Sequence, residues 1–114
     1  MMNEKINLAT ELNAISDYWS PRPIARMNEY NVMLVKVQGT FVWHKHDATD
    51  DFFLVLKGIL EIAMRNQTVT LGPGELFVVP KGAEHCPRAA EEAHILLIEP
   101  IGTVTTGDPR PSHS

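Results

Sequence analysis

The chain has 114 residues and a formal net charge of −4 at pH 7, with 44% hydrophobic and 21% charged residues. This length suits one domain with a single hydrophobic core, and this composition excludes the disordered and fibrous classes. The ten Lys and Arg residues are scattered along the chain and form no basic stripe. Neither nucleic acid nor an anionic membrane is therefore expected as a partner.

Membrane insertion, secretion and disulfide bonding are not expected either. The longest apolar runs, such as FFLVL, are far shorter than the roughly 18 residues that span a bilayer. The polar start MMNEKINLATELN lacks the regions of a signal peptide, so the expected location is the cytoplasm. Cys86 is the single cysteine. A metal would therefore have to be held by nitrogen and oxygen rather than by a cysteine cluster.

The first predicted element is a short amphipathic helix in NLATELNAISDYW, residues 7–19. Its apolar residues recur at helical spacing, and Asn7 or Thr10 can cap its start. The proline-containing segment SPRPI, residues 20–24, ends it.

From Ile24 onward, short runs rich in Val, Ile, Leu and Phe alternate with turn signals. The predicted strands are YNVMLVKVQG (30–39), TFVWHKH (40–46), DFFLVLKG (51–58), ILEIAM (59–64), QTVTL (67–71), LFVVP (76–80) and AHILLIEP (93–100). RNQ predicts a hairpin turn, and the Pro-Gly of LGPGE predicts a type II turn, in which glycine takes the positive φ. Many short strands after one helix predict an all-β sandwich or barrel.

Two histidines share one face of the strand predicted at 40–46. Side chains alternate along a strand, so His44 and His46 point to the same side. Two imidazoles side by side suit Zn, Fe, Mn, Ni or Cu, and a third histidine or a carboxylate from a neighbouring strand would complete a metal site. The candidates for completion are Asp50, Asp51 and His85.

The histidine pair belongs to a longer motif. Gly39 is followed by four residues and then His44 and His46; four more residues precede Asp51, and six separate it from Gly58.

A second motif follows in GELFVVPKGAEH, where Gly74, Pro80, Gly82 and His85 have fixed spacing. With both motifs in order over roughly residues 24–100, the chain resembles small single-domain cupins. It departs from their pattern in having Asp51 where they carry glutamate, Ala89 where they carry asparagine, and one residue fewer after Gly39.

The resemblance implies an all-β cupin-type double-stranded β-helix, a jelly-roll barrel, with one short N-terminal helix. It divides the chain into an N-terminal helical segment (1–20), the barrel (21–104) and a polar tail (105–114). It also implies a divalent transition metal (Fe, Mn, Zn or Ni) on His44, His46, Asp51 and His85, and a homodimer.

Asp51 is preferred to Asp50, which would leave seven residues before Gly58 and face the opposite side. Because an aspartate is one methylene shorter than a glutamate, it must draw its strand inward, bind through water, or leave ligation to the histidines.

Other polar and aromatic residues have simpler interpretations. Cys86 is expected to be a small buried hydrophobe rather than a nucleophile. His94 is expected to be a hydrogen-bonded structural histidine rather than a pocket residue, and His113 a solvated residue of the tail. Trp43 is expected to pack between sheets or between subunits. Phe53 points to the same side of its strand as Asp51 and is expected to form an apolar wall of the pocket.

The resemblance implies a small-molecule pocket at the barrel mouth. It leaves open a metal-dependent enzyme of the dioxygenase, isomerase or epimerase type on a small organic acid or sugar-like substrate. Alternatives are a non-catalytic binding or sensing module, with or without metal, and a metal-free barrel. Candidate anchors for an anionic substrate are Arg26, Lys36 and Arg88. The simpler expectation for each is an exposed charged side chain with no role in binding. No general base is identified.

Overall fold

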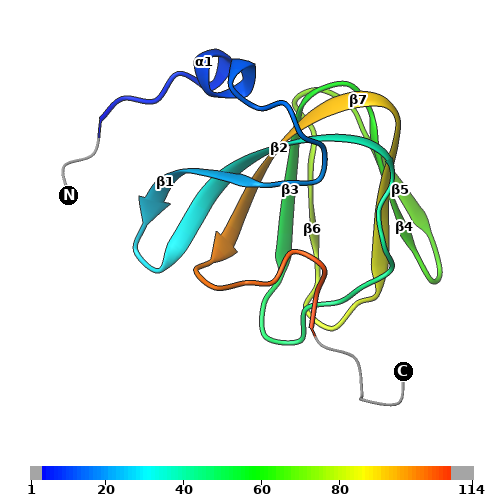
Figure 1. The fold of residues 1–114 in the computed structure, drawn as a ribbon. Helices are drawn as coiled ribbons and strands as arrows, with labels where there is room; N and C mark the ends of the chain where they lie inside the picture. The colour runs from blue at the N-terminus through cyan, green and yellow to red at the C-terminus, as the bar shows by residue number, and fades with distance from the viewer. Residues whose placement is uncertain (1–3, 109–114) are drawn as a thin grey trace.

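The computed structural model describes residues 4–108 (Figure 1). Its elements are α1 (Leu8–Asn13), β1 (Arg22–Met27), β2 (Tyr30–Thr40), β3 (Asp51–Lys57), β4 (Leu60–Met64), β5 (Thr68–Leu71), β6 (Leu76–Val79) and β7 (His85–Pro100). The predicted all-β barrel with one short N-terminal helix is confirmed. The division at residues 20 and 104 stays a prediction.

The long strand β7 organises the barrel. It pairs antiparallel with β2 along most of its length, with β4 near its start and with β3 near its end. The strand order is β1-β2-β7-β3-β6, and β4 also pairs with β5. Figure 1 shows β7 bending over the top of the molecule, so that the sheet curls around an interior. The two ends of β7 thus belong to different walls of one barrel.

The core lies inside this curl because apolar side chains alternate along the strands. The inward residues include Val35 and Val37 of β2, Phe53 and Val55 of β3, and Ile95 and Leu97 of β7. Glu99 continues the same alternating series on β7 and is also buried.

Three local predictions are confirmed. The Asn7 side chain caps α1 by accepting a hydrogen bond from the Thr10 amide at 3.0 Å. The β4–β5 hairpin turns at residues 65–67. Gly74 has a φ of 83°, and the Glu75 amide donates to the Gly72 carbonyl at 3.0 Å, as the predicted Pro-Gly turn requires.

The strand predicted at 40–46 is wrong beyond Thr40, where β2 ends. The chain there still lies beside the start of β7, where the Phe41 amide donates to the Pro87 carbonyl at 3.0 Å, but an isolated bridge between His44 and His85 replaces a continuous ladder. The structure also adds two pieces of strand that the sequence did not predict. β1 pairs with β2, and β7 begins at His85 rather than at residue 93.

The unpredicted start of β7 has a physical explanation. HCPRAAEE contains a proline and no run of large apolar residues, so its local pattern is weak. Pairing with β4, which places Cys86 opposite Ala63, and burial of Cys86 and Ala89 hold it in the sheet. Tertiary contacts therefore override the local preference.

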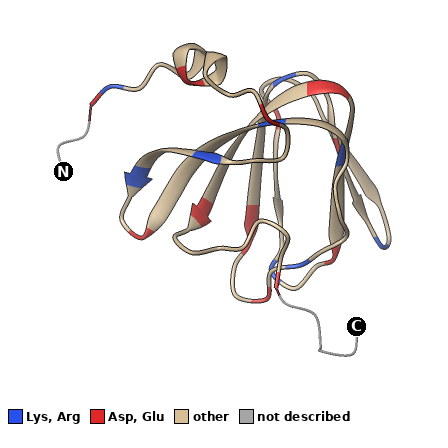
Figure 2. Cartoon of the chain, viewed as in Figure 1, with Lys and Arg blue, Asp and Glu red and all other residues tan. Residues whose placement is uncertain are grey.

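Charged residues are interspersed over the molecule. Figure 2 shows Lys and Arg positions on several elements, with Asp and Glu positions among them. Within residues 4–108 no helix has the length and apolar character needed to cross a membrane.

Candidate metal centre

Four side chains from three parts of the chain converge at one end of the barrel. His44 and His46 come from the loop between β2 and β3, Asp51 is the first residue of β3, and His85 is the first residue of β7. One potential ligand atom from each lies within 4.8 Å of all the others. Ligand atoms about 2.1 Å from one metal lie roughly 3 to 4.2 Å apart, so a small contraction would close the set.

Backbone hydrogen bonds bring the imidazoles together although His44 and His46 are not on a regular strand. The His44 amide donates to the His85 carbonyl at 3.0 Å, and the His85 amide donates back at 2.9 Å. This reciprocal pair sets the two ring centroids 4.3 Å apart. The His46 carbonyl accepts from the Gly82 amide at 2.7 Å, which fixes the loop at a second point.

The structure groups Asp51, rather than Asp50, with the histidines. Asp51 is 5% exposed, and its Oδ2 lies 3.0 Å from His85 Nε2 and 3.6 Å from His46 Nε2. Asp50 is exposed, and its carboxylate accepts a hydrogen bond from the Lys81 amide instead. Asp51 begins β3 and is buried, whereas Asp50 precedes the strand and is exposed.

The outer hydrogen bonds of two imidazoles suit metal binding. His44 Nδ1 lies 2.9 Å from the Val42 carbonyl, and His85 Nδ1 lies 2.9 Å from the Ala83 carbonyl. A carbonyl only accepts, so each Nδ1 carries the proton and each Nε2 offers its lone pair to the cluster. The 3.0 Å contact of His85 Nε2 with Asp51 then needs a second proton or a cation between them. The residues therefore fit a metal ion.

Electrostatics favour the same state for His44. Burial lowers the pKa of His44, and the nearby His85 and His46 lower it further, against the opposing effects of the Val42 carbonyl and Asp51. Neutral imidazole is the form that ligates a metal.

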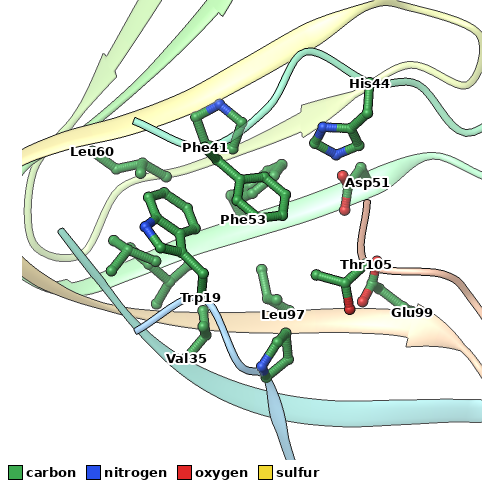
Figure 3. A pocket seen from close by; sticks show the side chains of 14 residues that line it. Trp19, Val35, Phe41, His44, Asp51, Phe53, Leu60, Leu97, Glu99 and Thr105 are labelled. Carbon is green, nitrogen blue, oxygen red and sulfur yellow. The ribbon is translucent and has the colours of Figure 1, made fainter. Parts of the chain in front are cut away.

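A pocket that is partly open to solvent adjoins the cluster. Figure 3 shows that it has two ends: Trp19, Phe41 and Leu60 surround the apolar end, whereas His44, Asp51, Thr105 and Glu99 lie at the other. Phe53 lines the pocket, which confirms its predicted role.

The sequence analysis missed Trp19, which forms part of the pocket wall. Its indole Nε1 donates to the Gln38 carbonyl at 2.9 Å, and its ring stacks on Phe41 with a centroid distance of 4.8 Å. The backbone φ of 60° is unusual for a bulky residue. These contacts fold the segment after α1 over the barrel, which no local pattern indicates.

Glu99 was also missed, although its position carried a signal. Ala93, Ile95 and Leu97, the alternate residues of β7 just before it, are apolar and buried, so an acid at the end of this series points into the barrel. It is 5% exposed. Burial raises the pKa of Glu99 to about 7, and the charge of Asp51 adds to the increase.

This raised pKa predicts a pH-dependent stability of the metal-free protein. Protonated Glu99 is favoured in the fold, so stability falls as pH rises from about 4.5 to about 7, by up to about 3 kcal/mol. Glu99→Gln should remove this loss, so that the variant exceeds the wild type in stability at pH 8 but not at pH 4. Urea unfolding with a chelator measures it, with exposed Glu91→Gln as the control. Identical pH profiles for Glu99→Gln and wild type would contradict the assignment.

The segment after β7 runs against the histidine loop. The Asp108 amide donates to the Lys45 carbonyl at 2.9 Å, and the Asp108 carboxylate accepts from the Asp47 amide at 2.6 Å. Gly107 is buried between them and His44, and Thr105 lines the pocket. The segment therefore supports the loop that carries two of the four cluster residues.

Gly107→Ala should displace this support. A Cβ at Gly107, where φ is 90°, would lie 2.7 Å from both His44 Cβ and the Lys45 carbonyl oxygen. We expect metal affinity to fall about tenfold, as for loss of an outer contact that orients a ligand. Metal titration measures it, with Gly102→Ala as the control, because Gly102 has the same φ and open space around its Cβ position. Equal affinities for the two variants would exclude this supporting role.

The remaining predicted residues lie outside the cluster. Arg88 pairs with Glu61 at 3.0 Å, and Lys36 donates to the Ile15 carbonyl at 2.8 Å; neither they nor Arg26 line the pocket. His94 bonds Glu92 at 2.7 Å, as expected of a structural histidine.

The other side-chain predictions have different outcomes. Cys86 is buried, as expected, and burial raises its pKa. Trp43 packs under the guanidinium of Arg65, 3.9 Å from the ring centroid. His113 lies outside the described residues.

Comparison with known proteins agrees with this architecture. Residues 31–99 match the family model of the cupin domain. The chain belongs to the cupin family. A solved cupin-2 domain protein of Shewanella frigidimarina is similar to this cupin with 52% identity and a TM-score of 0.82, over 83% of this chain and 93% of that one. Protein NMB1881 of Neisseria meningitidis has 35% identity and a TM-score of 0.78, over 85% and 99%. The uncharacterized protein YdbB of Bacillus subtilis is 28% identical, over 86% and 88%.

Proposed function

We propose that this cupin binds a divalent transition metal through His44, His46, Asp51 and His85 and holds a small molecule in the adjoining pocket. The observation that carries the proposal is the convergence of these four side chains within 4.8 Å. Three imidazoles and one carboxylate suit Fe, Mn, Zn or Ni, and four protein ligands leave positions for an exogenous molecule when the metal is five- or six-coordinate.

The pocket supports a metal-dependent enzyme. Bound at the cluster, a divalent metal would supply Lewis acidity to an oxygen atom of the ligand. The aromatic side chains of Trp19, Phe41 and Phe53 would exclude water and hold the apolar part of that ligand. We therefore propose a reaction of the dioxygenase, isomerase or epimerase type.

The alternative is a non-catalytic module that binds or senses a metabolite in the same pocket. Oxygen uptake or isomer formation that requires the bound metal would favour the enzyme. Tight binding of one metabolite without turnover on any metal would favour the module.

The metal site is tested by paired aspartate variants. Asp51→Ala should lower metal affinity at least about tenfold, because a buried carboxylate is lost from the cluster. Asp50→Ala, the matched control one residue away, should leave it unchanged. Asp51→Glu, which restores the residue usual in cupins, should raise the affinity or keep it. Metal analysis of protein purified without a histidine tag measures all three. A loss for Asp50→Ala with none for Asp51→Ala would overturn the ligand assignment.

A homodimer in solution remains part of the proposal. Met27 and Tyr30, which are cross-strand partners at the edge of the sheet, are 55% and 43% exposed, and Ile101 next to them is also exposed. A second copy would cover this apolar group. Light scattering distinguishes a dimer from a monomer.

A further inference from the structure

The polar end of the pocket contains a carboxyl group with no hydrogen-bond partner. Within residues 4–108, no group donates a hydrogen bond to the side chain of Glu99, although that residue is 5% exposed. No side-chain oxygen or nitrogen of the described residues is both sealed from solvent and unpaired. The Glu99 carboxyl therefore reaches the open space of the pocket that it lines. A carboxyl that is open to the pocket and has no protein partner is free to hydrogen-bond water or a ligand that enters there.

Glu99 lies where it could contact a small molecule that is bound at the metal. Phe52 of β3 pairs with Ile98 of β7, so Asp51 and Glu99 are neighbours across the same two strands. Figure 3 shows both carboxyl groups at the same end of the pocket, away from Trp19 and Phe41. A molecule that contacts the metal with one polar group would therefore bring that group close to Glu99.

The charges at the pocket disfavour an anionic ligand. Among residues 4–108, no Lys or Arg lines the pocket, whereas the two acids Asp51 and Glu99 do. Of the three cations considered from the sequence, Lys36 and Arg88 have other partners, and Arg26 is an exposed residue of β1 outside the lining. An ionised Glu99 together with Asp51 would offset the two charges of a divalent metal and leave no excess positive charge for a carboxylate.

We propose that Glu99 is the ligand-positioning residue of this pocket and that it selects an uncharged, hydroxyl-bearing molecule with an apolar ring or chain. This inference rests on the proposed function, which supplies the metal at the other side of the polar group. It narrows the substrate class from organic acids and sugars, because a sugar would place hydroxyl groups against the apolar end.

A hydroxyl group fits Glu99 in either protonation state. It donates to an ionised carboxylate and accepts from a protonated one, so the hydrogen bond persists across neutral pH. The apolar body would pack against the stacked pair of Trp19 and Phe41 and against Phe53, where aromatic rings prefer stacked or edge-to-face contact. Phenol is the simplest probe with both features, since it is uncharged at pH 7.

The test uses the emission of Trp19 in full-length protein with its bound metal, in a Trp43→Phe background so that one tryptophan reports. Phenol, toluene and benzoate are titrated in turn. We expect a Kd for phenol at least about tenfold below those for toluene and benzoate, as one hydrogen bond to a buried carboxyl allows. Glu99→Leu should raise the phenol Kd about tenfold and leave the toluene Kd unchanged, whereas Glu99→Gln, which keeps a hydrogen-bonding group, should retain the preference for phenol.

Glu91→Leu, an exposed acid changed on the same strand, is the matched control and should bind all three probes as the wild type does. Three results would overturn the assignment. They are toluene or benzoate binding as tightly as phenol, no saturation with phenol at millimolar concentration, and an unchanged phenol Kd in Glu99→Leu. The wild-type comparison stands even if a variant does not fold. Metal analysis of the same samples separates the two proposals: selectivity for phenol without metal rejects the metal site alone, and bound metal without selectivity rejects the role of Glu99 alone.

Discussion

His85→Ala is expected to abolish stable metal binding. His85 is 1% exposed, and its Nε2 lies 3.0 Å from Asp51 while its Nδ1 is held by the Ala83 carbonyl. Alanine keeps the backbone bridge to His44, so the loop geometry should survive while one ligand atom is lost. Loss of an orienting outer contact lowers metal affinity about 10- to 100-fold, and loss of a ligand should exceed that. Metal content of purified protein and thermal unfolding with and without chelator measure the effect.

The unfolding measurement separates ligation from general damage. Metal that binds only the folded state raises the midpoint, so chelator should lower it in the wild type and leave it unchanged in His85→Ala. His94→Ala is the matched control, because His94 is a largely buried histidine bonded to Glu92 away from the pocket. Equal metal content in the two variants would show that His85 is not a ligand.

Gly58→Ala should cause the largest loss of stability, about 3 kcal/mol or more. Its φ of 85° is costly for any residue with a Cβ, and that atom would lie 2.8 Å from the Glu92 carbonyl oxygen and 2.9 Å from Ala93 Cα. Both neighbours belong to β7, so neither can move without disturbing the sheet. The glycine lies where the β3–β7 register shifts and the chain turns toward β4.

Gly74→Ala separates the two causes. Gly74 has a φ of 83°, but a Cβ there would meet nothing within 4 Å. This variant should therefore show the backbone cost alone, about 1 to 2 kcal/mol. Urea unfolding of both metal-free variants measures the difference, which reports the close approach of Gly58 to β7. Equal losses of stability in the two variants would mean that β7 moves to accommodate the added Cβ at residue 58.

The two motifs predicted which residues the structure groups, but the reason given for their grouping was incomplete. His44 and His46 were placed on one face of a strand, whereas a bridge to His85 holds His44 and a hydrogen bond from the Gly82 amide holds His46. The spacing still predicted the group because it fixes where the loop enters and leaves the barrel. The preference for Asp51 over Asp50 rested on strand alternation, and β3 does begin at Asp51.

The pocket wall was much less accessible to sequence reasoning. Trp19 reaches the pocket because the segment after α1 folds back along β2, and Thr105 because the segment after β7 returns to the histidine loop. Such long-range returns leave no periodic signal, since a single contact far along the chain imposes no repeat. Glu99 could have been predicted from the sequence, because it follows the alternating apolar residues Ala93, Ile95 and Leu97 on the same face of β7.

The sequence by itself determined the strand-rich class, the short capped helix, the tight turns and the order of the polar motif residues, because each depends on neighbours a few positions away. Only the tertiary structure decided that β7 runs unbroken from His85 to Pro100 and that the pocket has an apolar end and a carboxyl-lined end. Those features form where segments distant in the sequence pack together and exclude water. The stabilising free energy comes from the contact between the segments, so neither segment shows it alone.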